Sequence, residues 1–306
     1  MRKYLPISLL LLFAFLIFAA IAFEPPLLDD PARLEQVEAR LRDGEPPLIA
    51  RGLRRLPSHE WASEHGAVMV DSAGWERPLW LDVNQTLPAP EFAPQRDEWT
   101  SKFWSPTIGK EHARVRSSVG LFDLTPFTKV EIEGPGATQW LNRMCSSEMD
   151  VPVGRIVYTL CLTPHGGVVF DITVTRLDRD RYLVVTGGGS GPRDLAWLRA
   201  HLPEGDAVRM REVTSSWAVS GLWGPNAREV LQPLVPQSLA NEAFPYMRAQ
   251  QIFIEHVPAL ALRISYAGEL GWELYVPSEY GGWTWERLME AGREHGIVAA
   301  GGGAFE

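Results

Sequence analysis

The sequence predicts an α+β fold of mixed antiparallel sheets and helices, preceded by an irregular connecting segment and an N-terminal apolar helix. Two observations predict this fold. Strand hairpins and single helices follow one another through most of the chain, and this mixture occurs about twice. A doubly wound parallel sheet would instead need a helix after almost every strand. With 306 residues, of which 45% are apolar, the chain is long enough for one large domain or two.

The apolar N-terminal helix is predicted within residues 1–23. Arg2 and Lys3 precede an almost uninterrupted apolar run over residues 7–23. As a helix this run would rise about 26 Å, just enough to span a hydrocarbon core of about 30 Å with snorkelling flanks. We expect a signal or anchor segment and favour the anchor, which would attach the body to a membrane. The alternatives are export through a cleavable signal, or an intracellular protein if this segment is a gene-prediction error.

A spacer and a connecting segment follow. Residues 24–50 are rich in Pro, Glu, Arg and Asp, with one helical stretch expected at 31–42. Residues 51–104 combine five tryptophans with many prolines, which favours an irregular packed segment over a flexible linker. Residues 105–306 then carry the regular pattern and form the principal predicted domain.

The elements expected in this domain come from periodicity and turn signals. Helices are predicted at residues 110–119, 136–144, 193–201, 226–231 and 282–295. Strands are predicted at residues 129–132, 156–162, 168–176, 181–186, 217–222, 261–265 and 271–276.

Charge and cysteine content argue against several functions. The net charge of −9 disfavours a nucleic-acid partner, which requires a local excess of Lys and Arg. Cys145 and Cys161 have no Cys-x-x-Cys spacing and no histidines at ligand spacing, so we expect neither a disulfide scaffold nor a metal site. A reduced compartment is the mild inference, although the two cysteines could bridge in an oxidising one.

The glycine run at residues 187–191 follows a predicted strand and precedes a predicted helix. Glycines in that position can bring backbone N–H groups to a phosphate. The spacing is neither Gly-x-Gly-x-x-Gly nor that of a P-loop, and Ser190 lacks the flanking glycine of a hydrolase nucleophile elbow. We therefore predict a strand-to-helix loop and no FAD site in this chain.

Asp171 is the first candidate site residue. It lies four residues past Gly167, beyond the hairpin signal at 163–167, on a strand that is otherwise apolar or β-branched. This position predicts a partly buried carboxylate that must have a partner. The alternative is that Asp171 only accepts hydrogen bonds from backbone or turn N–H groups.

Glu273 is the second candidate. Two glycines frame a tight turn within residues 266–273, and Glu273 enters the strand that follows. Strand alternation would place Glu273 and Tyr275 on one face, opposite Trp272. Such a carboxylate can accept two parallel hydrogen bonds from a flat donor edge, and Tyr266 can offer a ring face to a heterocycle. The alternative is a plain exposed glutamate at a hairpin.

Several motifs between about residues 100 and 306 keep a common order and spacing. They are Gly109-x-Glu111-His112, Gly120-Leu121-Phe122-Asp123, Gly166-Gly167-x-x-x-Asp171, Tyr182-Leu183-Val184-Val185-Thr186, Gly224-Pro225-Asn226-Ala227 and Tyr266-x-Gly268-Glu269-x-Gly271-Trp272-Glu273. Together they resemble the glycine-cleavage T-protein and the folate domains of dimethylglycine dehydrogenase, sarcosine dehydrogenase and the regulatory subunit of pyruvate dehydrogenase phosphatase. Upstream, residues 66–70 and 74–80 resemble the connecting segment of the dehydrogenase branch.

This resemblance implies a tetrahydrofolate cleft and one-carbon transfer. Asp171 would be the catalytic residue near the reactive nitrogen, Glu273 would hold the N–H edge of the pterin, Tyr266 would pack on it and Glu269 would be a neighbour. The substrates would be folate and an amine-derived imine, the product 5,10-methylenetetrahydrofolate, and a separate flavoprotein a candidate partner. Because the flavin part and the C-terminal part of the dehydrogenase branch have no counterpart here, the alternatives are a non-catalytic regulatory or scaffolding module and a fragment of a flavin-dependent dehydrogenase.

Overall fold

The computed structural model describes residues 52–90, 105–266 and 268–305. The chain divides into two units, Met1–Arg51 and Gly52–Glu306, and the described residues all belong to the second. The predicted apolar segment, the spacer and the helix expected at 31–42 lie outside the described residues. Within the described ranges, no helix is both long and apolar enough to cross a membrane.

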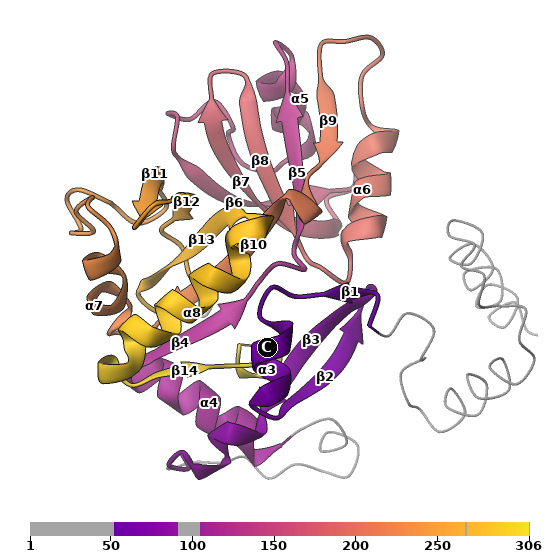
Figure 1. The fold of residues 1–306 in the computed structure, drawn as a ribbon. Helices are drawn as coiled ribbons and strands as arrows, with labels where there is room; N and C mark the ends of the chain where they lie inside the picture. Colours follow the sequence, from indigo (N-terminus) through magenta and orange to yellow (C-terminus); the bar gives the residue numbers. More distant parts are fainter. Residues whose placement is uncertain (1–51, 91–104, 267, 306) are drawn as a thin grey trace, which may run out of the picture. The chain divides into compact units, whose positions relative to one another are not determined.

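Three sheets make up the second unit (Figure 1). The smallest belongs to the connecting segment and has the order β1-β3-β2, with the parallel pair β1–β3 and the antiparallel pair β2–β3. Its strands are β1 (Arg54–Arg55), β2 (Ala67–Ser72) and β3 (Trp75–Leu81).

The five-stranded sheet has the order β6-β7-β8-β5-β9, and all neighbouring strands run antiparallel. Its strands are β5 (Thr128–Glu133), β6 (Ile156–Leu162), β7 (Val168–Asp178), β8 (Arg181–Thr186) and β9 (Arg209–Glu212).

The six-stranded sheet has the order β11-β12-β13-β10-β4-β14 and is antiparallel except for the pair β14–β4. Its strands are β4 (Val119–Asp123), β10 (Trp217–Trp223), β11 (Ala249–Ile254), β12 (Val257–Leu262), β13 (Gly271–Pro277) and β14 (Ile297–Ala299).

Helices connect these strands and cover the sheets. The α-helices are α3 (His59–Glu64), α4 (Pro106–Ser117), α5 (Ala137–Met144), α6 (Gly191–Ala200), α7 (Ala227–Leu231) and α8 (Gly281–Gly292). Short 3-10 helices span Asp82–Thr86, Thr214–Ser216, Gln232–Leu234, Ser278–Tyr280, Arg293–His295 and Gly302–Ala304.

The α+β prediction is confirmed, but the connecting segment, which was expected to be irregular, contains helix α3 and a three-stranded sheet within residues 52–90. Helix α4 begins earlier than predicted because Pro106 opens it and the Ser105 side chain accepts a hydrogen bond from the Thr107 N–H. It ends at Ser117, so that Val119 begins strand β4. Seven strands of the described residues were not predicted, namely β1, β2, β3, β4, β9, β11 and β14, and the strand predicted at 261–265 corresponds to β12, which ends at Leu262.

Three clusters of buried hydrophobic residues pack against the faces of the two large sheets. Helices α7 and α8 cover one face of the six-stranded sheet, and α5 and α6 cover one face of the five-stranded sheet. The third cluster contains residues from both sheets, among them Leu183 and Val185 of β8 and Val219 of β10. The two sheets therefore face one another through this third cluster, and the space between them is where a site can form.

The connecting segment is fixed to the body through a buried carboxylate. Glu111 on α4 is fully buried and accepts hydrogen bonds from the backbone N–H of Leu81 at 2.8 Å, the Asn84 side chain at 2.7 Å and the backbone N–H of Gly301 at 3.0 Å. Burial raises the pKa of Glu111 to about 7, although these three donors oppose the rise. This one side chain therefore joins the small sheet, α4 and the C-terminal residues.

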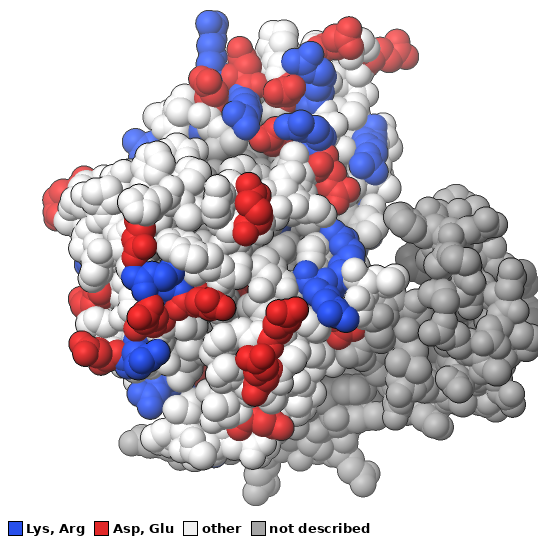
Figure 2. All heavy atoms as spheres, in the orientation of Figure 1, with Lys and Arg blue, Asp and Glu red and all other residues white. Residues whose placement is uncertain are grey.

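On the face drawn in Figure 2, basic and acidic side chains are interspersed over the five-stranded sheet. Within this sheet, Glu131 of β5 forms salt bridges with Arg181 at 2.6 Å and with Arg211 at 2.8 Å. Charges of both signs are thus mixed on this face of the five-stranded sheet.

Candidate functional site

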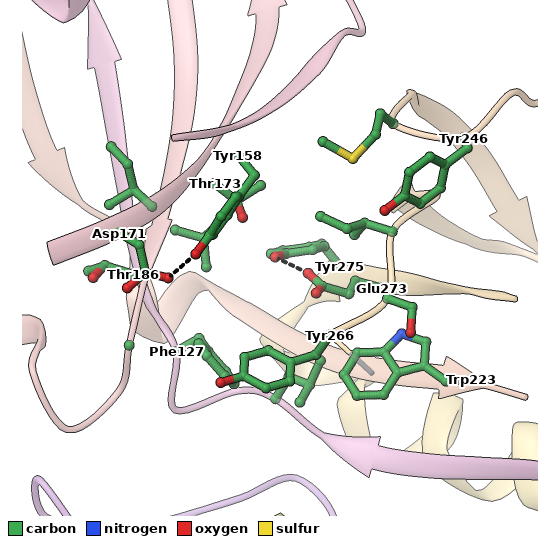
Figure 3. A pocket seen from close by; sticks show the side chains of 17 residues that line it. Phe127, Tyr158, Asp171, Thr173, Thr186, Trp223, Tyr246, Tyr266, Glu273 and Tyr275 are labelled. Carbon is green, nitrogen blue, oxygen red and sulfur yellow. Dashed lines mark hydrogen bonds between the residues drawn. The ribbon is translucent and has the colours of Figure 1, made fainter. Parts of the chain in front are cut away.

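A cavity of about 370 Å³ lies between the five-stranded and six-stranded sheets (Figure 3). Its lining residues come from strands of both sheets and from the loops beside them. They are Leu124, Phe127, Tyr158, Asp171, Ile172, Thr173, Val185, Thr186, Gly187, Trp223, Tyr246, Met247, Ile264, Ser265, Tyr266, Glu273 and Tyr275. Three residues singled out from two separate sequence motifs therefore share one cavity, namely Asp171 from the first motif and Tyr266 and Glu273 from the second.

Strand β13 presents Glu273 to this cavity from the middle of the six-stranded sheet. Glu273 lies between Gly221 of β10 and Leu262 of β12. Tyr275 lines the cavity on the same side, while Trp272 packs in the core on the opposite side, as strand alternation predicts. The Tyr275 hydroxyl donates a hydrogen bond to Glu273 Oε2 at 2.8 Å.

The position of β13 depends on a glycine at its first residue. A Cβ added to Gly271 would lie 2.1 Å from the carbonyl oxygen of Leu222 and 2.7 Å from the Trp223 ring. Only glycine allows this approach of the two strands. Gly271, which the sequence marks as part of a turn, thus allows the start of β13 to pack closely against β10, and Glu273 follows two residues later.

Glu273 combines a partly buried position with few internal partners. Burial raises its pKa to about 7, while the Tyr275 hydrogen bond and the charge of Lys129 act in the opposite direction. Among the described residues, Tyr275 alone hydrogen-bonds this carboxylate. The carboxylate consequently keeps acceptor positions for a ligand in the cavity.

Strand β7 presents Asp171 from the facing sheet, and here one prediction was wrong. Asp171 is exposed, not partly buried, because alternation along β7 buries Phe170 and Ile172 and leaves Asp171 at the open side of the cavity. It does have a partner, since the Tyr158 hydroxyl donates a hydrogen bond to Asp171 Oδ2 at 3.0 Å. This bond is to a side chain rather than to the backbone or turn N–H groups of the alternative.

Tyr158 was missed in the sequence, although the hairpin register contains the signal. Asp171 is paired with Leu160, and Tyr158 is two residues before Leu160 on β6. Diagonal neighbours on one face of an antiparallel pair are within reach of long side chains. The hydrogen bond to Asp171, followed by burial, raises the pKa of Tyr158, so the hydroxyl stays protonated and can donate.

The two remaining candidates, Tyr266 and Glu269, lie in the loop before β13 and have different surroundings. Tyr266 is exposed at the cavity, with its ring centroid 5.1 Å from that of Phe305. Glu269 is not among the residues that line the cavity. Its carboxylate forms a salt bridge of 2.7 Å with Arg116 on α4. The structure therefore brings Tyr266, but not Glu269, together with Asp171 and Glu273.

Lys129 is a second residue that the sequence did not mark. Its side chain is completely buried, and its ammonium group donates hydrogen bonds to the carbonyl oxygens of Thr125 at 2.8 Å and Phe127 at 2.6 Å. A charged residue in an alternating strand normally faces solvent, so the pattern gave no reason to single it out.

The glycine run forms the loop between β8 and α6, as predicted. Its conformation is held by Asp194, a buried carboxylate that accepts hydrogen bonds from the hydroxyls of Thr186 at 2.6 Å and Ser190 at 2.7 Å. Gly187 lines the cavity. These contacts give the loop a structural role at the base of the helix.

A family comparison connects this arrangement with known proteins. The family model described as the GCVT N-terminal domain matches residues 58–306. The chain belongs to this family. The matched region includes α3, β2 and β3, so most of the small sheet lies within it together with both walls of the cavity.

Curated relatives of the domain include oxidases, dehydrogenases and aminomethyltransferases. The chain is 34% identical over 251 residues to 4-methylaminobutanoate oxidase (formaldehyde-forming) of Paenarthrobacter nicotinovorans, covering 82% of this chain and 30% of that protein. It is 37% identical over 228 residues to mitochondrial dimethylglycine dehydrogenase of Rattus norvegicus, covering 74% and 26%. It is 31% identical over 256 residues to the aminomethyltransferase of Symbiobacterium thermophilum, covering 82% and 62%. The chain thus spans less than two thirds of each of these relatives.

Solved structures share the fold of this GCVT-type domain. Aminomethyltransferase T of the glycine cleavage system from Bartonella henselae superposes with a TM-score of 0.65 at 23% identity, covering 83% of this chain and 61% of that one. A heterotetrameric sarcosine oxidase from Corynebacterium superposes with a TM-score of 0.51 at 19% identity, covering 80% and 98%. At these identities the likeness concerns the fold.

Proposed function

We propose that this domain binds tetrahydrofolate in the cavity between its two large sheets and transfers a one-carbon unit to it, giving 5,10-methylenetetrahydrofolate. The observation that carries this proposal is the meeting of Asp171, Tyr266 and Glu273, which come from two distant motifs, in one cavity of an aminomethyltransferase-type fold. The names of the relatives, which include aminomethyltransferases and dimethylglycine dehydrogenases, agree with it.

Recognition of the pterin would fall to Glu273 and Tyr266. A pterin presents neighbouring N–H groups along one edge, and a carboxylate that accepts two of them gives a strong and geometrically selective contact. Glu273 has the free acceptor capacity for this and lies beside Trp223 and Tyr275. The exposed ring of Tyr266 offers an aromatic face to the same ligand.

The chemistry would centre on Asp171. One amine nitrogen of tetrahydrofolate attacks the methylene carbon of an amine-derived iminium ion, and a C–N bond forms. The Asp171 carboxylate orients that amine, stabilises the positive charge that develops on nitrogen and receives the proton. Asp171 returns this proton to the nitrogen of the donor amine, whose C–N bond breaks as the second folate nitrogen, losing its own proton to solvent, closes the ring on the same carbon. Tyr158 fixes the Asp171 carboxylate through its hydrogen bond.

The imine requires prior oxidation of an amine, which we assign to a separate flavoprotein partner. Support comes from the kinds of relative that the chain resembles in part. It covers 30% of an amine oxidase and 24% of a sarcosine oxidase alpha subunit. In this proposal the present domain receives the imine and passes its carbon to folate.

Calorimetric titration of the full-length chain with tetrahydrofolate tests the proposal. We expect micromolar binding, about −8 kcal/mol, that weakens in Glu273→Gln and persists in Asp171→Asn. Asp171→Asn should instead abolish transfer from a dimethylamine–formaldehyde iminium donor. Glu269→Gln is the matched control, because it removes a carboxylate outside the cavity and should bind like wild type. A folded wild-type chain that binds no folate would favour the non-catalytic regulatory or scaffolding module instead.

A further inference from the structure

The two cysteines of the sequence lie directly opposite one another in the fold. Cys145 follows the last residue of α5 with an extended backbone, and it forms an isolated antiparallel bridge with Cys161 of β6. Both side chains are buried in the hydrophobic cluster between the five-stranded sheet and helices α5 and α6. Both thiols are free in this structure. The fold thus brings together two cysteines whose pairing the sequence leaves open.

Hydrogen bonds beside the two cysteines fix the register of this bridge. The N–H of Ser146 donates to the carbonyl oxygen of Leu160 at 2.9 Å, and the N–H of Ser147 donates to the Thr159 hydroxyl at 3.1 Å. The first bond joins the residue after one cysteine to the residue before the other. This pattern defines a non-hydrogen-bonded pair, whose Cα atoms lie about 4.5 Å apart in an antiparallel ladder.

The spacing of such a pair suits a disulfide bond. Disulfides join Cα atoms that are about 4.4–6.8 Å apart, and a pair spaced by about 4.5 Å lies inside this range. Side chains of a non-hydrogen-bonded pair also approach one another more closely than those of a hydrogen-bonded pair. The two thiols can therefore be joined without a large movement of the backbone.

The surroundings of the two cysteines favour a disulfide over a metal site. The cluster around them is apolar and includes Trp140, Met149 and Phe170. Within the described ranges, no group of three or more His, Cys, Asp and Glu side chains could hold a metal ion. Two thiols alone supply too few ligands for a structural zinc ion, which takes four. The chemistry open to this pair is consequently reaction of one thiol with the other.

We propose that Cys145 and Cys161 form a disulfide bond when the chain folds in an oxidising environment, and that this bond joins the end of α5 to β6. The bond closes a loop over residues 146–160, and a loop of about 15 residues restricts the unfolded chain enough to stabilise the folded one. Tyr158 belongs to this loop but faces the cavity, whereas Cys161 faces the helices. The proposal is therefore independent of the proposed function.

Closure of the bond requires an oxidant, for which we name a low-molecular-weight disulfide such as oxidised glutathione. One cysteine thiolate attacks this disulfide, forms a mixed disulfide and releases one glutathione. The second thiolate attacks the protein sulfur of the mixed disulfide, so that the protein S–S bond forms and the second glutathione leaves. The protein loses two electrons and two protons, and the oxidant becomes two molecules of thiol.

The burial of the pair determines when this reaction is fast. Interaction with the Cys161 thiol, followed by burial, raises the pKa of Cys145. Because the thiolate is the nucleophile, exchange should be slow in the folded protein. In the unfolded chain a cysteine has its ordinary pKa of about 8.5, so thiolate is available at pH 8. The bond should therefore form during folding, before the core closes around the two thiols.

The first test counts free thiols after oxidative refolding. The full-length chain is unfolded in urea and refolded at pH 8 with oxidised and reduced glutathione, then denatured, alkylated with iodoacetamide and weighed by intact-mass spectrometry. We expect a monomer without alkyl groups, which gains two after reduction. Cys145→Ala is the matched control and should carry one glutathione or one alkyl group. Two alkyl groups, retained glutathione or disulfide-linked dimers in the wild type would overturn the proposal.

The second test compares the thermal midpoints of the oxidised and reduced proteins. Closing a loop of about 15 residues should raise the midpoint by about 6–12 °C. Addition of dithiothreitol during unfolding should remove this increase in the wild type and leave the midpoint of Cys145→Ala unchanged. A disulfide that forms but lowers the midpoint would show that the folded structure does not accommodate the bond, and the proposal would fail.

Discussion

Glu111 and Glu273 are two glutamates with the same raised pKa, about 7, but with opposite surroundings. Glu111 uses both carboxylate oxygens, accepting hydrogen bonds from Leu81, Asn84 and Gly301. Glu273 accepts one hydrogen bond, from Tyr275, and faces a cavity. In both cases burial is the largest cause of the shift.

The difference shows that a perturbed pKa does not by itself identify a functional carboxylate. Structural networks raise pKa values as effectively as ligand sites do. What separates the two glutamates is unused acceptor capacity that opens into a space large enough for a ligand. By this criterion Glu111 is a structural junction between the connecting segment and the body, and Glu273 is a binding group. Substitution of Glu111 should therefore lower the stability of the fold, whereas substitution of Glu273 should lower the affinity for the ligand.

The largest effect is expected from Glu111→Ala. Removing the carboxylate leaves three buried N–H donors without an acceptor, which should lower the free energy of unfolding by about 3 kcal/mol and the thermal midpoint by about 6–12 °C. Thermal unfolding followed by circular dichroism would measure this. The tetrahydrofolate Kd of the folded fraction should stay at its wild-type value. A folded Glu111→Ala protein with weakened binding would contradict the division between the two glutamates.

Glu273→Gln should have the reverse profile. A neutral amide can accept only one of two N–H bonds and presents its own donors to the ligand, so affinity should fall about 30-fold, or about 2 kcal/mol. The thermal midpoint at pH 7.5 should change little, since the amide removes a partly desolvated charge. Titration calorimetry and a thermal melt of the same sample measure both quantities. Wild-type affinity in this variant would show that Glu273 does not bind the ligand.

The pH dependence of stability sharpens the comparison further. Each glutamate has a folded-state pKa near 7, above the unfolded value of about 4.3. The folded state therefore holds more protons between these limits, and its stability is lost as pH rises from about 4.5 to about 7. Each group contributes at most about 1.4 kcal/mol per pH unit. Urea unfolding from pH 5 to 8 should show a shallower decline in both Glu111→Gln and Glu273→Gln. An unchanged slope in either would show that its pKa is not raised.

Sequence reasoning succeeded where the signal is local. The 266–273 turn and the alternation after it placed Glu273 and Tyr275 on one face, and glycine spacing placed Asp171 in a hairpin. It failed where the environment depends on a second sheet. Whether Asp171 is exposed, or Lys129 buried, follows from how the two sheets face one another, which no spacing within one strand encodes. Glu269 matches the motif as well as Glu273 does, but Arg116 of a distant helix engages it.

The smallest effect is expected at the facing wall, from Tyr158→Phe. The hydrogen bond that Tyr158 donates to Asp171 lies in an exposed setting, where water can replace the hydroxyl. Its loss should cost about 0.5–1 kcal/mol, a two- to fivefold slower transfer from the iminium donor, with folate affinity nearly unchanged. Single-turnover rates measure the first and calorimetry the second. Tyr280→Phe, an exposed tyrosine outside the cavity lining, serves as control. A loss as large as that of Asp171→Asn would mean that Tyr158 itself moves the proton, and the facing wall would then hold two catalytic groups instead of one oriented carboxylate.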